Sequence, residues 1–221
     1  MSRRPPWLDA RVAEYIAGHA APPDEVLQRL VEETREATGQ AAGMQIGADQ
    51  GALLQLLTAL TGATLAVEIG TFTGYSSICI ARGLRPGGRL VCFDISEEYT
   101  RIARRAWARA GLEDRIDLHI GPAGENLHVL PDDREVDFAF VDADKGGYLD
   151  YVETLLPRLR RSGLICVDNT LWGGTVAAPP EEGLDDAGVA LAAFNDAVAA
   201  DPRLDAFILP IGDGVTLLRK R

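Results

Sequence analysis

The sequence predicts an α/β domain built around a mostly parallel sheet. From Thr64 onward, short apolar runs alternate with longer amphipathic stretches. Two of the apolar runs, at 138–141 and 164–167, stop abruptly at acidic or amide side chains. Runs of this length bounded by polar turn residues are typical of buried parallel strands, and their alternation with helices places helices on both faces of the sheet. Near the end of the chain, two apolar runs flank Gly212-Asp213-Gly214 and predict a β-hairpin, which makes one strand antiparallel to the rest.

The elements follow in order from these patterns. Residues 7–62 predict helices, because Pro22-Pro23-Asp24 is a helix start signal and leucines recur at helical spacing after it and again after Asp49. Ser96 and Gly111 are suited to begin and end another helix. We expect strands over 65–69, 89–93, 116–120, 136–141 and 164–167, helices over 75–83, 96–111, 148–159 and 187–200, and a hairpin over 206–211 and 215–220.

The domain organisation is simple, because the chain has no internal repeat and no linker. Its 221 residues suffice for one α/β domain with a substantial core. We therefore expect a single domain over residues 1–221. Within it, residues 1–62 form an N-terminal helical cap, and residues 63–221 form the core that binds a cofactor and a metal.

Composition narrows the possible partners. The net charge of −11 argues against a nucleic-acid or anionic-membrane partner, since either needs a basic face, and the arginines over 101–109 are expected on a solvated helix face. The three cysteines lie far apart in apolar runs, as buried reduced thiols do. Arg3-Arg4-Pro5-Pro6 does not lead into a signal peptide, and no apolar run approaches the ~20 residues of a membrane span. We expect a cytoplasmic enzyme.

Polar side chains follow the two apolar runs that stop abruptly. Asp142 ends the first run, and Asp168 and Asn169 end the second. Ligands of open α/β sheets bind at the carboxyl ends of the strands, so these three oxygen-bearing side chains indicate a hard divalent cation such as Mg²⁺. The alternative is structural: Asp142 and Asp144 would be helix caps, Lys145 a solvated lysine, and 168–169 a turn.

A second site is indicated after the first strand. The motif there is Gly-x-x-x-Gly, made by Gly70 and Gly74, with the acidic residue Glu68 two positions before the first glycine. It differs from the Gly-x-Gly-x-x-Gly motif of dinucleotide binding. A sulfonium cofactor with an amino-acid end tolerates a nearby carboxylate, and Glu68 suits its amino group. Asp94, just past the second strand, suits the ribose hydroxyls of an adenosine cofactor. A turn or helix-cap role for Asp94 is the alternative.

These residues resemble the cation-dependent O-methyltransferases of the catechol and caffeoyl-CoA type. The likeness covers the chain from about Tyr15 to its end, and the segments 141–145 and 168–172 are its most specific part. It implies the Rossmann-like class I methyltransferase fold, with seven strands ordered 3-2-1-4-5-7-6 and the terminal hairpin antiparallel. It also implies S-adenosyl-L-methionine, a divalent cation (Mg²⁺, or Ca²⁺ or Mn²⁺), a small aromatic acceptor, and a homodimer that uses the N-terminal helices.

Residue roles follow from the same resemblance. It implies Asp142, Asp168 and Asn169 as metal ligands, and Lys145 as the general base beside Asp142. Trp172, Tyr148 and Met44 would lie on the acceptor side. The cofactor contacts it implies are Ile46, Glu68, Gly70, Thr71, Ser76, Asp94, Ala123 and Asp142.

The predicted activity is methylation of one hydroxyl of a catechol-type small molecule. The alternatives are a class I methyltransferase for another hydroxylated molecule, a nicotinamide oxidoreductase, and a protein that binds a cofactor without catalysis. Ala192 stands where the plant enzymes carry a substrate-binding arginine, and the acidic segment 175–188 resembles a lid. Both features disfavour an anionic acceptor. His19, His119 and His128 have no spacing typical of a ligand set, and Asp144 has no assigned role.

Overall fold

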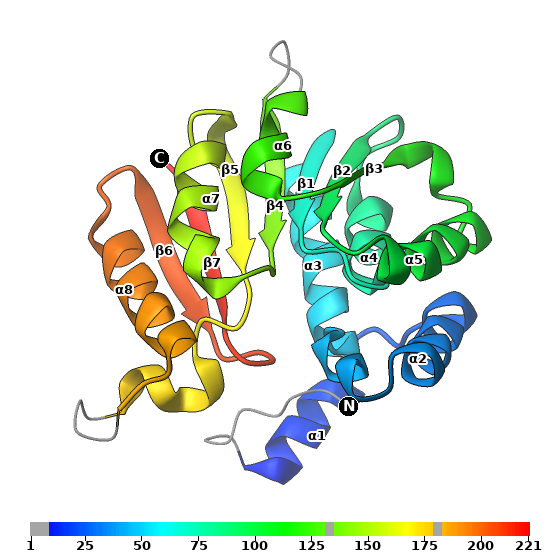
Figure 1. Ribbon diagram of the computed structural model, residues 1–221, viewed down its shortest axis with the longest axis horizontal. Coiled ribbons are helices and arrows are strands. Elements are labelled where there is room, and N and C mark those ends of the chain that lie inside the picture. The colour runs from blue at the N-terminus through cyan, green and yellow to red at the C-terminus, as the bar shows by residue number, and fades with distance from the viewer. Residues whose placement is uncertain (1–8, 131–134, 179–182) are drawn as a thin grey trace.

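The computed structural model describes residues 9–130, 135–178 and 183–221 (Figure 1). The Arg3–Pro6 segment, the first residues of the helical region expected from residue 7, and residues 179–182 of the acidic segment lie outside the described residues. Among the described residues, no helix combines the length and the apolar character that crossing a membrane requires.

A seven-stranded sheet forms the centre of the molecule, in the order β3-β2-β1-β4-β5-β7-β6. The first five strands are mutually parallel, and β7 runs antiparallel to both β5 and β6. The predicted order and the terminal hairpin are confirmed, and this is the class I methyltransferase fold. The strands are β1 (Leu65–Ile69), β2 (Arg89–Asp94), β3 (Ile116–Ile120), β4 (Val136–Val141), β5 (Leu159–Val167), β6 (Leu204–Leu209) and β7 (Val215–Lys220).

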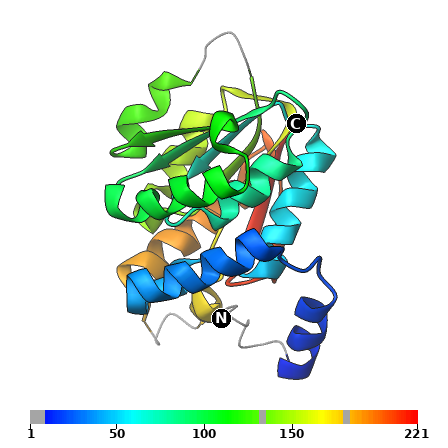
Figure 2. The same cartoon turned by 90° about the vertical axis from the view of Figure 1, so that its right-hand side faces the viewer.

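Helices cover both faces of the sheet (Figures 1 and 2). Leu30, Leu54 and Trp107 belong to the core on one face, which is covered by α2, α3, α4 and α5. Tyr148 and Phe194 belong to the core on the other face, under α6, α7 and α8. The helices are α1 (Ala10–Gly18), α2 (Glu25–Thr38), α3 (Ala48–Thr61), α4 (Tyr75–Gly83), α5 (Glu97–Arg109), α6 (Ala123–Asn126), α7 (Tyr148–Leu155) and α8 (Asp186–Ala200), with 3₁₀ turns at η1 (Gly39–Met44), η2 (Glu113–Arg115), η3 (Leu127–Val129), η4 (Lys145–Gly147) and η5 (Trp172–Ala177).

The predicted helix starts have the expected caps. Asp24 accepts a hydrogen bond from the backbone N–H of Leu27 at 3.1 Å, and Ser96 accepts one from that of Tyr99 at 3.2 Å. Each side chain satisfies a backbone donor that the first turn of a helix leaves unpaired. Local sequence signals therefore fix where α2 and α5 begin.

Several elements differ from the prediction. β6 is observed at Leu204–Leu209, two residues earlier than the expected 206–211. β5 begins at Leu159, five residues before the apolar run, because its polar first half still pairs with β4 across an irregular register and Ser162 has a positive φ of 61°. α7 ends at Leu155, where a turn begins, and not at residue 159. The four-residue helix α6 was not predicted, since it is too short to show a helical period.

Candidate active site

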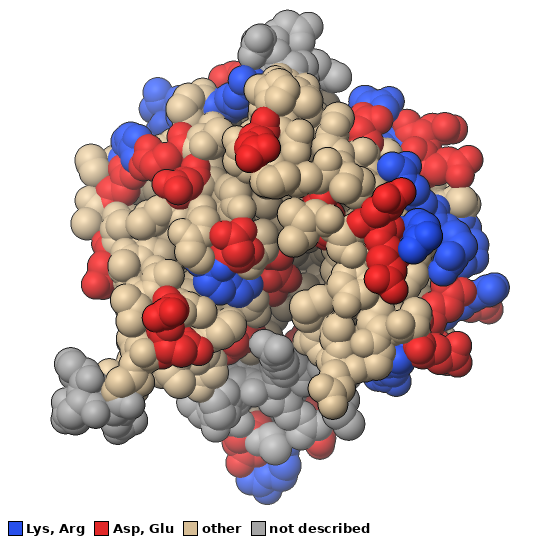
Figure 3. All heavy atoms as spheres, in the orientation of Figure 1, with Lys and Arg blue, Asp and Glu red and all other residues tan. Residues whose placement is uncertain are grey.

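A cavity of about 570 Å³ opens over the carboxyl ends of β1, β2, β4 and β5. Its wall is made by residues that are far apart in sequence, from Gly43 before α3 to Asp213 in the terminal hairpin. Figure 3 shows a hollow near the middle of this face, with acidic side chains at its edge. The strand order reverses between β1 and β4. In open α/β sheets, ligands bind at the carboxyl ends of the strands beside such a reversal, so the cavity lies where the fold favours a ligand site.

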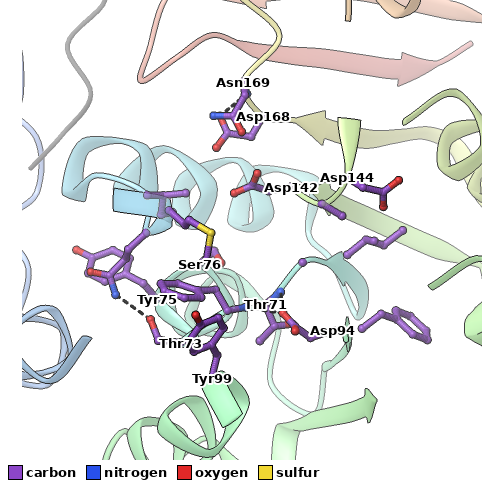
Figure 4. Close-up of a pocket in the computed structure, with 18 of the residues that line it drawn as sticks. Thr71, Thr73, Tyr75, Ser76, Asp94, Tyr99, Asp142, Asp144, Asp168 and Asn169 are labelled. Atoms are coloured by element: carbon purple, nitrogen blue, oxygen red, sulfur yellow. Dashed lines mark hydrogen bonds between the residues drawn. The ribbon is translucent and has the colours of Figure 1, made fainter. Parts of the chain in front are cut away.

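The loop after β1 forms one end of the cavity, and Asp94 organises it. The Asp94 carboxylate accepts hydrogen bonds from the backbone N–H groups of Thr71 at 2.9 Å and Phe72 at 2.7 Å through Oδ2, and from that of Ser96 at 2.7 Å through Oδ1. Phe72 has a φ of 50°, a conformation that is strained for a non-glycine residue. Asp94 also lines the cavity (Figure 4). Asp94 therefore holds the turn and also lines the cavity, while its contact with the ribose of a cofactor stays a prediction.

Gly70 brings the ends of β1 and β4 together. Its φ is 90°, and a Cβ atom added to it would lie 1.9 Å from the carbonyl oxygen of Asp142. Its N–H donates to the carbonyl of Phe93 at 2.9 Å, and the N–H of Asp142 donates to the carbonyl of Ile69 at 2.8 Å. Only glycine combines this φ with so close an approach. The backbone of the loop after β1 is thus packed against the backbone of Asp142, one of the predicted metal ligands.

Glu68 lies beneath this loop and does not line the cavity. The side chain is completely buried, and the Cys92 thiol donates to its Oε2 at 3.3 Å. Burial raises the pKa of Glu68 to about 7, although the polar groups of Ser76, Cys92, Thr71 and Ser77 oppose the shift. The structure therefore places Glu68 as a support of the glycine loop, and a direct contact with a cofactor amino group stays a prediction.

All predicted cofactor residues except Glu68 line the same cavity. These residues are Ile46, Gly70, Thr71, Ser76, Asp94, Ala123 and Asp142. They come from the segment before α3, from the β1 and β2 ends, from the first turn of α4, from the start of α6 and from the end of β4. Sequence reasoning therefore found one continuous wall from residues that span nearly a hundred positions.

The other end of the cavity holds a cluster of oxygen atoms around Lys145. Its Nζ donates to Asp142 Oδ1 at 3.0 Å, to Asn169 Oδ1 at 2.6 Å and to the hydroxyl of Tyr148 at 2.7 Å. An ammonium group has three N–H donors and no acceptor, so all of them are used. The geometry shows that a positive charge is stabilised between two of the three predicted metal ligands.

Asp168 completes this cluster from the end of β5. It has 3% of its surface exposed, and its Oδ1 accepts from the N–H of Asn169 at 2.7 Å, with Asn169 at a φ of 59°. Figure 4 shows Asp142 and Asp168 directed toward one another, whereas Asp144 points away from both. Burial, followed by the charge of Asp142, raises the pKa of Asp168 well above its usual range. A bound cation would offset this repulsion.

The predicted ligand set fits a hard divalent cation. Among the described residues, no group of three or more histidine, cysteine, aspartate or glutamate side chains is placed to hold a metal ion. The predicted set has only two carboxylates, and its third oxygen comes from the Asn169 amide. Oxygen ligands of this kind suit Mg²⁺, Ca²⁺ or Mn²⁺. Two of the three side chains already share one cation, the Lys145 ammonium.

The residues predicted for the acceptor divide into two groups. Trp172 and Met44 line the cavity, and Met44 has 50% of its surface exposed. The Trp172 indole N–H lies 3.0 Å from Asp185 Oδ1, which holds the ring at the start of α8. Tyr148, by contrast, is completely buried behind Lys145 and does not line the cavity. The structure therefore does not bring Tyr148 to the acceptor side.

Several cavity residues were missed from the sequence. Tyr151 donates its hydroxyl to Asp144 Oδ1 at 2.6 Å, and both line the cavity. Asp213 reaches it from the hairpin turn and accepts from the N–H of Gly173 at 2.6 Å. Gln50 reaches it from α3. The seven-residue spacing of Asp144 and Tyr151, and the polar residue in the hairpin turn, could have indicated these contacts from the sequence. No sequence pattern indicated that Gln50 would line the cavity.

The comparisons with known proteins agree with this arrangement. The family model of the O-methyltransferases matches residues 17–221. A probable caffeoyl-CoA O-methyltransferase 2 of Dictyostelium discoideum is 37% identical over 212 residues, which cover 95% of this chain and 91% of the relative. Caffeoyl-CoA O-methyltransferase 1 of Eucalyptus globulus is 40% identical over 199 residues, covering 86% and 81%. The structure of the O-methyltransferase from Bacillus cereus in complex with SAH superposes with a TM-score of 0.85 at 32% identity, covering 96% of this chain and 97% of the other.

Fold and site together define a class I methyltransferase. The chain belongs to the O-methyltransferase family. The predicted family and enzyme class, an S-adenosylmethionine-dependent O-methyltransferase, are confirmed.

Proposed function

We propose that the protein methylates one hydroxyl of a vicinal dihydroxy aromatic molecule, with S-adenosylmethionine as the methyl donor and a divalent cation at Asp142, Asp168 and Asn169. The observation that carries this proposal is the oxygen cluster around Lys145 at the carboxyl ends of β4 and β5. Three ligands from the protein leave positions open for the two oxygens of a catechol.

The residues divide the reaction between them. A bound cation lowers the pKa of a coordinated phenol, which is otherwise near 10, and the sulfonium donor supplies the methyl group. In its neutral amine form, Lys145 is the group placed to take the phenolic proton, because it contacts two of the proposed ligands directly. The indole of Trp172, fixed by Asp185, offers an apolar surface for the aromatic ring. The chain otherwise contributes positioning, which supplies roughly 7–11 kcal/mol in favourable cases.

The charge of the cavity wall favours an uncharged or cationic acceptor. Its described residues include five aspartates and a single basic side chain, Lys145, which is already paired. Ala192, at the position where the sequence resemblance implies an arginine, does not line the cavity. Some relatives are named for a caffeoyl-CoA acceptor, but this wall offers no second cation to a CoA phosphate.

Matched acceptors test the proposal. Purified protein is incubated with S-adenosylmethionine and Mg²⁺ and either a neutral vicinal diphenol or the corresponding 3-hydroxy and 4-hydroxy monophenols, and products are measured by mass spectrometry. We expect methylation of the diphenol and little of either monophenol, because only the diphenol can chelate. Equal rates on all three would favour the alternative, a class I methyltransferase for another hydroxylated molecule. A diphenol with an anionic arm, such as a benzoate or a CoA ester, tests the charge of the wall.

A further inference from the structure

We infer that Tyr148 is the positioning residue of Lys145: its hydroxyl links the side-chain nitrogen of Lys145 to the backbone at the end of β5. The inference rests on the proposed role of Lys145 as the base. Tyr148 is not assigned a contact with the acceptor, because it lies behind Lys145 and away from the cavity wall.

The direction of the hydrogen bonds is fixed by chemistry. The Tyr148 hydroxyl lies 3.0 Å from the backbone carbonyl oxygen of Asp168 and 2.7 Å from Lys145 Nζ. A carbonyl can only accept, so the single hydroxyl proton points at Asp168. The hydroxyl oxygen therefore accepts from Lys145. The bonds form a chain from the Lys145 nitrogen through Tyr148 to the backbone of a predicted metal ligand.

The Tyr148 ring is held rigidly. The residue has no exposed surface, and its ring meets that of Phe194 edge to face, with the centroids 5.7 Å apart. Lys145 Nζ also lies 5.0 Å from the centre of the Tyr148 ring. Burial raises the pKa of the Tyr148 hydroxyl well above its usual range, so it keeps the proton that it donates to Asp168. Tyr148 thus offers Lys145 a fixed acceptor in a close-packed core.

The partners of Lys145 are not equivalent. Asp142 and Asn169 are proposed cation ligands, so their oxygens are used when a cation is bound. Tyr148 has no place in that ligand set, and its hydroxyl stays available to Lys145. It is therefore the partner that holds the Lys145 nitrogen beside the acceptor during the reaction. Without the hydroxyl, the flexible lysine side chain has no fixed acceptor on the core side.

The chain allows this to be tested without any reaction. It contains only two lysines, Lys145 and Lys220, and Lys220 Nζ donates to the backbone carbonyls of Leu156 and Leu159. In ¹H–¹⁵N spectra of the side-chain ammonium groups, the Lys145 signal is assigned by its loss in Lys145→Met. We expect Tyr148→Phe to broaden or shift this signal through faster hydrogen exchange, while the Lys220 signal is unchanged. A Lys145 signal identical to that of the wild type would overturn the inference.

A double-mutant cycle tests the role in the reaction. We expect Tyr148→Phe to lower kcat by about 10- to 100-fold with little change in the KM for S-adenosylmethionine, since a misplaced group costs rate more than binding. In a Lys145→Met background, the same substitution should change kcat by less than about twofold, because Tyr148 acts through Lys145. Equal losses in both backgrounds would show that Tyr148 supports only the fold.

A matched control separates stability from positioning. Thr58 is equally buried and donates its hydroxyl to the backbone carbonyl of Leu54 at 2.7 Å, away from the cavity. Thr58→Val therefore removes a comparable hydrogen bond, and we expect it to leave kcat and the Lys145 signal unchanged. If the wild type methylates no diphenol and yet Tyr148→Phe alters the Lys145 signal, the proposed function fails while the link between Tyr148 and Lys145 stands.

Discussion

The side-chain nitrogen of Lys145 lies 2.6 Å from the amide oxygen of Asn169. The same nitrogen lies 3.0 Å from Asp142 Oδ1. Both oxygens belong to the proposed ligand set of a divalent cation, so the ammonium group and the cation draw on the same two side chains. Lys145 is thus an internal cation at the site while it is protonated, and the proposed base once it is a neutral amine.

Removal of this internal cation should strengthen metal binding. We expect Lys145→Met to bind Mn²⁺ about tenfold more tightly than the wild type, because it removes both a competitor for Asp142 and Asn169 and a repulsive charge. Affinity is measured by calorimetry without donor or acceptor. Arg104→Met, which removes one positive charge from an exposed position of α5, should leave the affinity unchanged. Equal or weaker Mn²⁺ binding by Lys145→Met would contradict the shared use of these oxygens.

Gly70 should tolerate no side chain. A Cβ atom there would lie 1.9 Å from the carbonyl oxygen of Asp142, in addition to the cost of a φ of 90°. We expect Gly70→Ala to lower the free energy of unfolding by about 3 kcal/mol or more, measured by urea denaturation. Gly87→Ala is the matched control, since Gly87 has a φ of 76° with nothing within 4 Å of the added atom. It should cost only about 1–2 kcal/mol. Similar losses in both variants would exclude the close approach as the cause.

The bounds of the central strands show how much of the fold can be predicted from the sequence. β1 and β4 were predicted at their observed bounds, because each is a mostly apolar run with a single acidic residue, as buried parallel strands are near-continuous apolar runs. The strand order that the resemblance implied makes β4 and β5 neighbours, which places Asp142 near Asp168 and Asn169. β5 was predicted too short, since its first half is polar and is recognisable only through its pairing with β4.

In the site, too, the side-chain contacts that depend on tertiary structure could not be predicted from local sequence patterns. Asp94 was recognised as a cavity residue, but its bonds to the Thr71 and Phe72 backbone depend on a loop conformation that no local pattern specifies. Tyr148 was expected beside the acceptor because the family resemblance implied it. The first turn of α7 instead directs it into the core, against Phe194. Which face of a short helix a residue occupies depends on tertiary packing.

Glu68 should make stability depend on pH. Its pKa is raised from an ordinary value of 4.5 to about 7, so between these values the folded state holds a proton that the unfolded state has lost. The contribution of Glu68 to wild-type stability therefore falls as the pH rises from about 4.5 to 7, by up to about 1.4 kcal/mol per pH unit. Glu68→Gln keeps a neutral side chain at every pH.

We expect the stability of Glu68→Gln, relative to the wild type, to increase across this range and to level off above pH 7. The measurement is chemical denaturation at a series of pH values. Glu36→Gln, which removes an exposed carboxyl from α2, controls for the change in net charge. A difference between Glu68→Gln and the wild type that is constant with pH would show that Glu68 is ionised in the folded protein.

The central claim is that Asp142, Asp168 and Asn169 hold a cation required for methyl transfer. The most direct measurement is the rate of transfer from S-adenosylmethionine to a neutral diphenol, first in EDTA and then after Mg²⁺ is added in excess. We expect no activity in the chelator, full recovery with Mg²⁺, and no recovery in Asp142→Ala that retains its circular dichroism spectrum. Full activity of the wild-type protein in EDTA would contradict this claim.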